Sequence, residues 1–131
     1  MRVFVSAYDV DARPACLLIV RLGELGVSVD HSPRPDPAVD DRWSDWYAHG
    51  LRAALVQAHA AVVVIDEVWD SSTWMAEEAR VATDRADRDG MRYFTWNPSD
   101  VDVKAAGMIP YLRNLLPANL KDAADRIVGA V

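Results

Sequence analysis

The sequence predicts an α/β fold in which helices cover both faces of a parallel β-sheet. Short apolar segments rich in β-branched residues alternate about five times with longer segments of helical period. This alternation is typical of a parallel sheet, because the connections between parallel strands place helices on its faces. The clearest strand is the continuously apolar AVVVID at residues 61–66, as expected for a strand covered on both sides.

The first half of the chain contains two expected strands and one helix. Residues 2–8 (RVFVSAY) form a strand pattern that stops at the polar pair Tyr8 and Asp9. Residues 12–26 are expected to be helical, with Pro14 tolerated in the first turn and Gly26 as the C-terminal stop. Residues 27–32 (VSVDHS) are a second strand, and three prolines within residues 33–42 predict a loop.

The second half continues the alternation. Residues 43–60 repeat apolar side chains at spacings of three and four, which predicts a helix before the strand at 61–66. Residues 73–89 form the next expected helix, ended by Gly90, and residues 91–97 a strand closed by Pro98. Residues 109–116 are expected to hold a short fifth strand, and residues 117–131 a final helix.

Length and composition favour one ordinary globular domain over residues 1–131. The chain is 51% hydrophobic and 26% charged, and it contains no internal repeat and no stretch of linker composition. A formal net charge of −6 disfavours nucleic acid and anionic membranes as partners. No apolar stretch reaches membrane-spanning length and no signal-peptide pattern opens the sequence, so we expect a cytoplasmic protein.

Cofactor and metal motifs are absent from the sequence. The three histidines are scattered, and none has metal-ligand spacing with an acid or with Cys16, the single cysteine, so no metal site is expected. No glycine-rich phosphate loop follows a strand, which argues against a dehydrogenase that uses NAD as a hydride carrier.

The carboxyl ends of the strands are where a parallel sheet binds ligands, so the candidate site follows Tyr8, Asp30 and Ile65. His31, at the end of the second strand, and Asp66, after the third, are therefore candidate ligand contacts.

Helical geometry separates the adjacent acids Glu77 and Glu78. The stripe that should face the sheet consists of Met75, Ala79, Ala82 and Ala86. Glu77 points away from it, whereas Glu78 lies about 70° from its centre, beside Trp74 one turn earlier. Glu78 is thus expected at the boundary of the helix face, at the rim of a cleft.

Four of the five tryptophans gather around the ends of two loops. Trp43 and Trp46 open the helix after the proline-rich loop, and Trp69 and Trp74 lie between the third strand and the start of the next helix, together with Ser72. Indoles, hydroxyls and acids at one place suit a ligand with a flat ring and a sugar. The alternative interpretation is that the tryptophans only seal the core.

VFVSAYDVD, AVVVID and SSTWMAEEA together resemble the Toll/interleukin-1 receptor (TIR) domain family, in particular its stand-alone bacterial type. The residues that match the family pattern are Ser6, Tyr8, Asp9, Ser72, Trp74 and Glu78. The sequence departs from the pattern where Ala7 separates Ser6 from Tyr8 and where Met75 replaces a frequent cysteine.

The resemblance implies a flavodoxin-like, three-layer α/β/α fold with a central five-stranded parallel sheet. For the enzymatic branch it implies cleavage of NAD at the nicotinamide–ribose bond by Glu78, with NAD as substrate and no cofactor. It further implies self-association on activation. The product would be a signal derived from ADP-ribose, read by an effector protein in bacterial antiphage defence.

One carboxylate is chemically sufficient for this reaction. Nicotinamide leaves NAD as a neutral molecule, so no general acid is needed, unlike in ordinary glycosidases. Glu78 would stabilise the oxocarbenium-like transition state or attack to form a transient ester. Tyr8, Trp69 and Trp74 would stack the rings, and Ser6, Asp66 and Ser72 would bind hydroxyls.

Two other functions fit the same residues. One is a nucleoside 2-deoxyribosyltransferase-like enzyme or nucleotide N-glycosidase, which would prefer a mononucleoside or nucleotide to NAD. The other is a non-enzymatic TIR adaptor, in which Glu78 is inert surface. Release of a base from purified protein and substrate separates these classes.

Overall fold

The fold is a parallel sheet between two layers of helices, seen in a computed structural model that describes residues 1–33, 49–66, 73–102 and 109–130. Within these residues the sheet has four strands in the order β2-β1-β3-β4, all parallel. This confirms the predicted α/β class. The strands are β1 (Arg2–Ser6), β2 (Ser28–His31), β3 (Ala60–Val64) and β4 (Arg92–Trp96).

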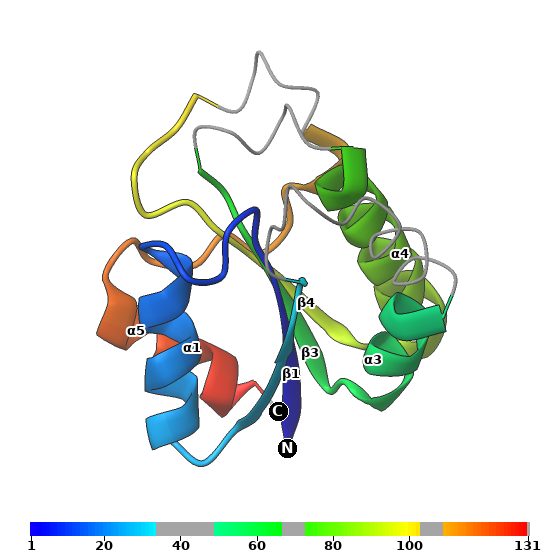
Figure 1. The fold of residues 1–131 in the computed structure, drawn as a ribbon, viewed down its shortest axis with the longest axis horizontal. Coiled ribbons are helices and arrows are strands. Elements are labelled where there is room, and N and C mark those ends of the chain that lie inside the picture. The colour runs from blue at the N-terminus through cyan, green and yellow to red at the C-terminus, as the bar shows by residue number, and fades with distance from the viewer. Residues whose placement is uncertain (34–48, 67–72, 103–108, 131) are drawn as a thin grey trace.

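The helices divide between the two faces of the sheet, with α1 and α5 on one face and α3 and α4 on the other (Figure 1). α3 and α4 pack with Phe4 of β1, whereas α1 and α5 pack with its neighbours Val3 and Val5, because successive side chains of a strand point to opposite faces. The helices are α1 (Ala15–Glu24), α3 (Leu51–Gln57), α4 (Thr73–Asp89) and α5 (Leu120–Gly129), with a 3-10 turn η4 (Ile109–Tyr111).

Local sequence signals account for the ends of several helices. Gly26 and Gly90 follow α1 and α4 with φ of 84° and 71°, a left-handed conformation that glycine adopts without strain. Asn119 caps α5, its side chain accepting a hydrogen bond of 3.1 Å from the backbone N–H of Asp122. The predicted limits of α4, residues 73–89, match the structure.

The predicted fifth strand does not form within the described residues. Residues 109–111 are the turn η4, and the rest of the segment contributes one isolated bridge, between Thr95 and Leu115. At this edge of β4, side-chain hydrogen bonds stand where the backbone hydrogen bonds of a fifth strand were expected. The Thr95 hydroxyl lies 3.2 Å from the carbonyl of Tyr111, and the Asn114 side chain donates to the carbonyl of Tyr93. Asn114 has a φ of 52°, which interrupts an extended strand.

The helix predicted over residues 43–60 ends earlier in the structure than expected. α3 ends at Gln57, because Ala58 is extended and Ala60 already pairs with Val3 in the sheet. Residues 43–48 lie outside the described residues. No helix in the described ranges is both long and apolar enough to cross a bilayer.

Candidate functional site

Three buried polar side chains from three elements meet at the carboxyl edge of the sheet. Ser6 ends β1, Ser32 follows β2, and Glu78 lies on α4; their exposed fractions are 2%, 0% and 0%. Both serine hydroxyls contact the same carboxylate oxygen, Oε1 of Glu78, at 3.0 Å from Ser6 and 2.7 Å from Ser32. A buried carboxylate loses its hydration, and these hydroxyls replace part of it.

Strand alternation explains why Ser6 reaches Glu78. Phe4 packs on the α3 and α4 side of the sheet, so Ser6, two residues later, points to the same side. The Ser6 hydroxyl also lies 3.7 Å from the sulfur of Met75, one turn before Glu78 on α4. Ser6, which was expected to bind a hydroxyl of the substrate, thus binds the carboxylate of Glu78 in this structure.

Ser32 was not among the residues that the sequence singled out. It continues the register in which Val5 pairs with His31, so it stands beside Ser6 at the strand ends. Its backbone N–H donates to the carbonyl of Val5 at 3.1 Å, which keeps the two strand ends together. A signal was present in the sequence: Ser32 is the last residue of the predicted strand 27–32, and ligands of a parallel sheet bind at the carboxyl ends of its strands.

Glu78 lies deeper than a boundary residue. A helical wheel gives the direction of a side chain relative to the sheet, but it does not show how far the strand ends extend over the flank of the helix. Ser6 and Ser32 contact the carboxylate on that flank, and Glu78 has no exposed surface.

Glu77 has a different environment from Glu78, as its helical position predicted. Its side chain is 42% exposed and forms an ion pair with Arg80. The hydrogen bond from Arg80 lowers the pKa of Glu77. Two adjacent glutamates therefore differ completely in burial.

The other predicted residues surround the strand ends or lie outside the described part. Tyr8, Asp9, His31 and Asp66 are half-buried. Asp9 turns the loop after β1, accepting the N–H of Asp11 at 3.0 Å, and Nδ1 of His31 lies 2.7 Å from the carbonyl oxygen of Ser32. The predictions for Trp43, Trp69 and Ser72 lie outside the described residues, as does the side chain of Trp74, whose backbone is in the first turn of α4.

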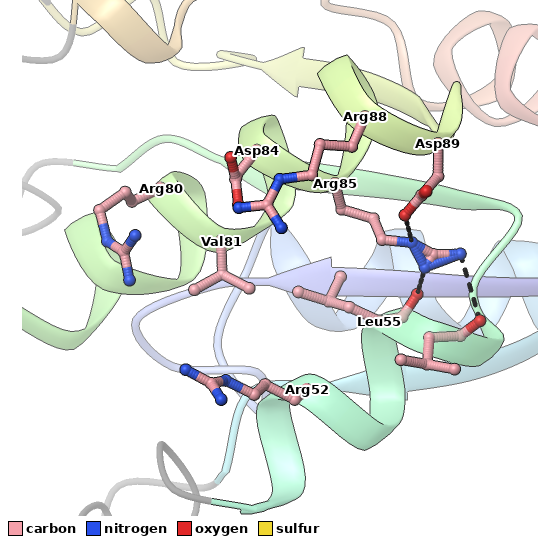
Figure 2. A pocket seen from close by; sticks show the side chains of 9 residues that line it. Arg52, Leu55, Arg80, Val81, Asp84, Arg85, Arg88 and Asp89 are labelled. Carbon is pink, nitrogen blue, oxygen red and sulfur yellow. Dashed lines mark hydrogen bonds and ion pairs between the residues drawn. The ribbon is translucent and has the colours of Figure 1, made fainter.

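A groove of about 400 Å³ between α3 and α4 does not include Glu78 (Figure 2). Most of its arginines are already engaged: Arg85 donates to Asp89 and to the carbonyls of Leu55 and Val56, and Arg88 pairs with Asp84. Arg85 on α4 therefore joins the two helices across this groove, through its hydrogen bonds to the carbonyls of α3. Within the described ranges no cluster of histidine, cysteine and acidic side chains is arranged to hold a metal ion.

No protein-family model matches the sequence, and no curated protein matches it either. The fold is similar to that of the TIR domains in a solved structure of the activated Roq1 resistosome directly recognizing the pathogen effector XopQ. The match has a TM-score of 0.60 at 22% sequence identity, and it covers 77% of this chain and 58% of that chain. This likeness concerns the fold, which is TIR-like.

Proposed function

We propose that this protein cleaves the nicotinamide–ribose bond of NAD, with Glu78 as the catalytic carboxylate. The observation that carries the proposal is a fully buried carboxylate at the carboxyl edge of a parallel sheet, held by two hydroxyls. β1 has β2 on one side and β3 on the other, so the direction in which successive strands are added to the sheet reverses beside it. Ligands of open α/β sheets bind at such a point.

The reaction balances with one carboxylate. The bond between ribose C1′ and the pyridinium nitrogen breaks, and its electron pair neutralises the nitrogen, so nicotinamide leaves uncharged. The carboxylate of Glu78 stabilises the positive charge that develops on the ribose. Water then attacks C1′ and loses a proton to give ADP-ribose, or a nucleophile of the same molecule attacks to give a cyclic isomer.

The residues around the strand ends have supporting roles in the proposal. Tyr8 and the tryptophans Trp43, Trp69 and Trp74 stack the nicotinamide or adenine ring and keep water away. Asp9, His31, Asp66 and Ser72 bind sugar hydroxyls. In a bacterial cell the product would signal to an effector protein in antiphage defence.

Self-association is part of the proposed activation. Glu78 has no exposed surface in the single chain, so substrate reaches it only when the atoms that cover it move. If association between copies drives that movement, turnover per molecule rises with protein concentration and with added crowding agent. A turnover that stays constant across both would contradict activation by assembly.

The test is release of nicotinamide from NAD by the purified protein. Glu78→Gln should abolish turnover without unfolding the protein, because the amide keeps the shape of the side chain but lacks its charge. Glu77→Gln is the matched control, one residue away on the same helix and exposed, and it should leave turnover nearly intact. Equal loss from both variants would contradict the assignment.

Parallel assays with a mononucleotide and a 2′-deoxynucleoside separate the substrate classes. Base release from these alone would favour an N-glycosidase or deoxyribosyltransferase. A protein that releases no base from any of them, at any concentration, would be an adaptor.

A further inference from the structure

The direction of the hydroxyl proton of Ser32 is determined by its neighbours. The backbone N–H of Ala7 donates to Oγ of Ser32 at 3.0 Å, so the oxygen already acts as an acceptor there. Oε1 of Glu78 lies 2.7 Å from the same Oγ. Because a hydroxyl has a single proton, Ser32 donates it to Glu78. The hydrogen bond from the Ala7 N–H and the hydrogen bond to the Glu78 carboxylate polarise the Ser32 hydroxyl in the same direction.

Ser6 holds the carboxylate less firmly. Its hydroxyl lies 3.0 Å from Oε1, a longer distance than that of Ser32, and the sulfur of Met75 is a second, weak acceptor at 3.7 Å. Ser32 therefore has one fixed orientation, whereas the proton of Ser6 has two possible directions.

Ser32 also connects the elements that define the site. Its backbone N–H donates a hydrogen bond to the carbonyl of Val5 in β1. Its hydroxyl oxygen accepts a hydrogen bond from the N–H of Ala7, in the loop after β1, and its hydroxyl donates to Glu78 on α4. The fully buried hydroxyl of Ser32 thus links the Glu78 carboxylate to the ends of both β1 and β2.

We infer that Ser32 is the positioning residue for Glu78: its hydroxyl, oriented by the Ala7 amide, fixes the carboxylate where the reacting sugar must meet it. The inference rests on the proposed function. A displaced carboxylate binds substrate as before but stabilises the transition state less well. Loss of Ser32 should therefore lower kcat and leave KM unchanged.

Three substitutions at this position test the inference in the full chain with NAD as substrate. Ser32→Ala should lower kcat about 10- to 100-fold at a KM within about twofold of the original value. Ser32→Cys keeps a group of similar shape but donates weakly, so it should lose nearly as much. Ser32→Thr keeps the hydroxyl and should restore most of kcat.

Ser6→Ala is the matched control, since it removes the other hydroxyl bound to Oε1 and should lower kcat less than Ser32→Ala. Equal kcat for the alanine and threonine variants, or a larger loss from Ser6→Ala, would overturn the inference. Unfolding curves identify any variant that fails to fold, and the kcat values of the folded variants then test the inference.

A readout without substrate separates this inference from the proposed function. In protein labelled with ¹³C at the glutamate carboxyl, the Glu78 resonance is identified by its loss in Glu78→Gln. Ser32→Ala should shift it more than Ser6→Ala does, and Ser32→Thr should shift it least. Absence of nicotinamide release would defeat the proposed function alone, whereas a Glu78 resonance insensitive to Ser32→Ala would defeat the inference.

Discussion

The two faces of the sheet bury side chains of different chemistry. The core between the sheet and the helices α1 and α5 is apolar, from Val3 and Val5 to Leu18 and Ile127. The face covered by α3 and α4 has an apolar core as well, but the five buried polar side chains of the described residues belong to this side: Ser6, Ser32, Glu78, Thr83 and Thr95.

This difference bears on the proposed function. Hydrocarbon side chains would fill the same space without the desolvation that a buried carboxylate undergoes, and replacing buried charges by apolar groups is often neutral or stabilising. The cluster of Ser6, Ser32 and Glu78 at the carboxyl edge of one face is the feature on which the proposed function rests. The face covered by α1 and α5 stabilises the sheet through the burial of apolar side chains.

The largest expected effect comes from making the two faces alike. In the double variant Ser6→Ala and Glu78→Met, Ser32 is kept because it accepts the N–H of Ala7. Turnover should fall by at least about 10²- to 10³-fold. The free energy of unfolding should drop by about 1–3 kcal/mol, because the buried Ser32 hydroxyl loses its acceptor. Denaturant unfolding and nicotinamide release measure the two quantities. A larger loss of stability would mean that the cluster holds the fold together.

The converse change is made on the apolar face. Leu18 on α1 is fully buried, and Leu18→Ala should lower the free energy of unfolding by about 2–5 kcal/mol through lost burial and the cavity left behind. Turnover per folded molecule should stay within about twofold, because the change is on the other side of the sheet from Glu78. A large drop in kcat for the folded variant would show that the two faces are coupled.

The smallest effect is expected at Glu77, on the exposed side of α4. Its ion pair with Arg80 is a surface pair, so Glu77→Gln should change the free energy of unfolding at pH 7 by about 0.5 kcal/mol or less. Because Arg80 lowers the pKa of Glu77, the contribution exists above the ordinary glutamate pKa and is lost as the pH falls through the lowered value. Urea unfolding of both proteins from pH 7 to about pH 3 should show their difference shrinking; a difference that grows would contradict this sign.

Much of the fold could be predicted because its signals are local. The C-terminal limit of α4 follows from Gly90, and its buried stripe Met75, Ala79 and Ala82 follows from helical spacing. The fifth strand was overestimated because the apolar residues of 109–116 resemble a strand, whereas hydrogen bonds from Thr95 and Asn114 decide their conformation.

By itself the sequence determined the strand–helix alternation, the parallel sheet and the different directions of Glu77 and Glu78 on their helix, since each depends on a local sequence pattern. Only the tertiary structure decided that Glu78 is fully enclosed and that Ser32 holds it. The hydroxyls that bind Glu78 come from residues 72 and 46 positions away, and strand register, not local spacing, brings them within 3.0 Å of the carboxylate.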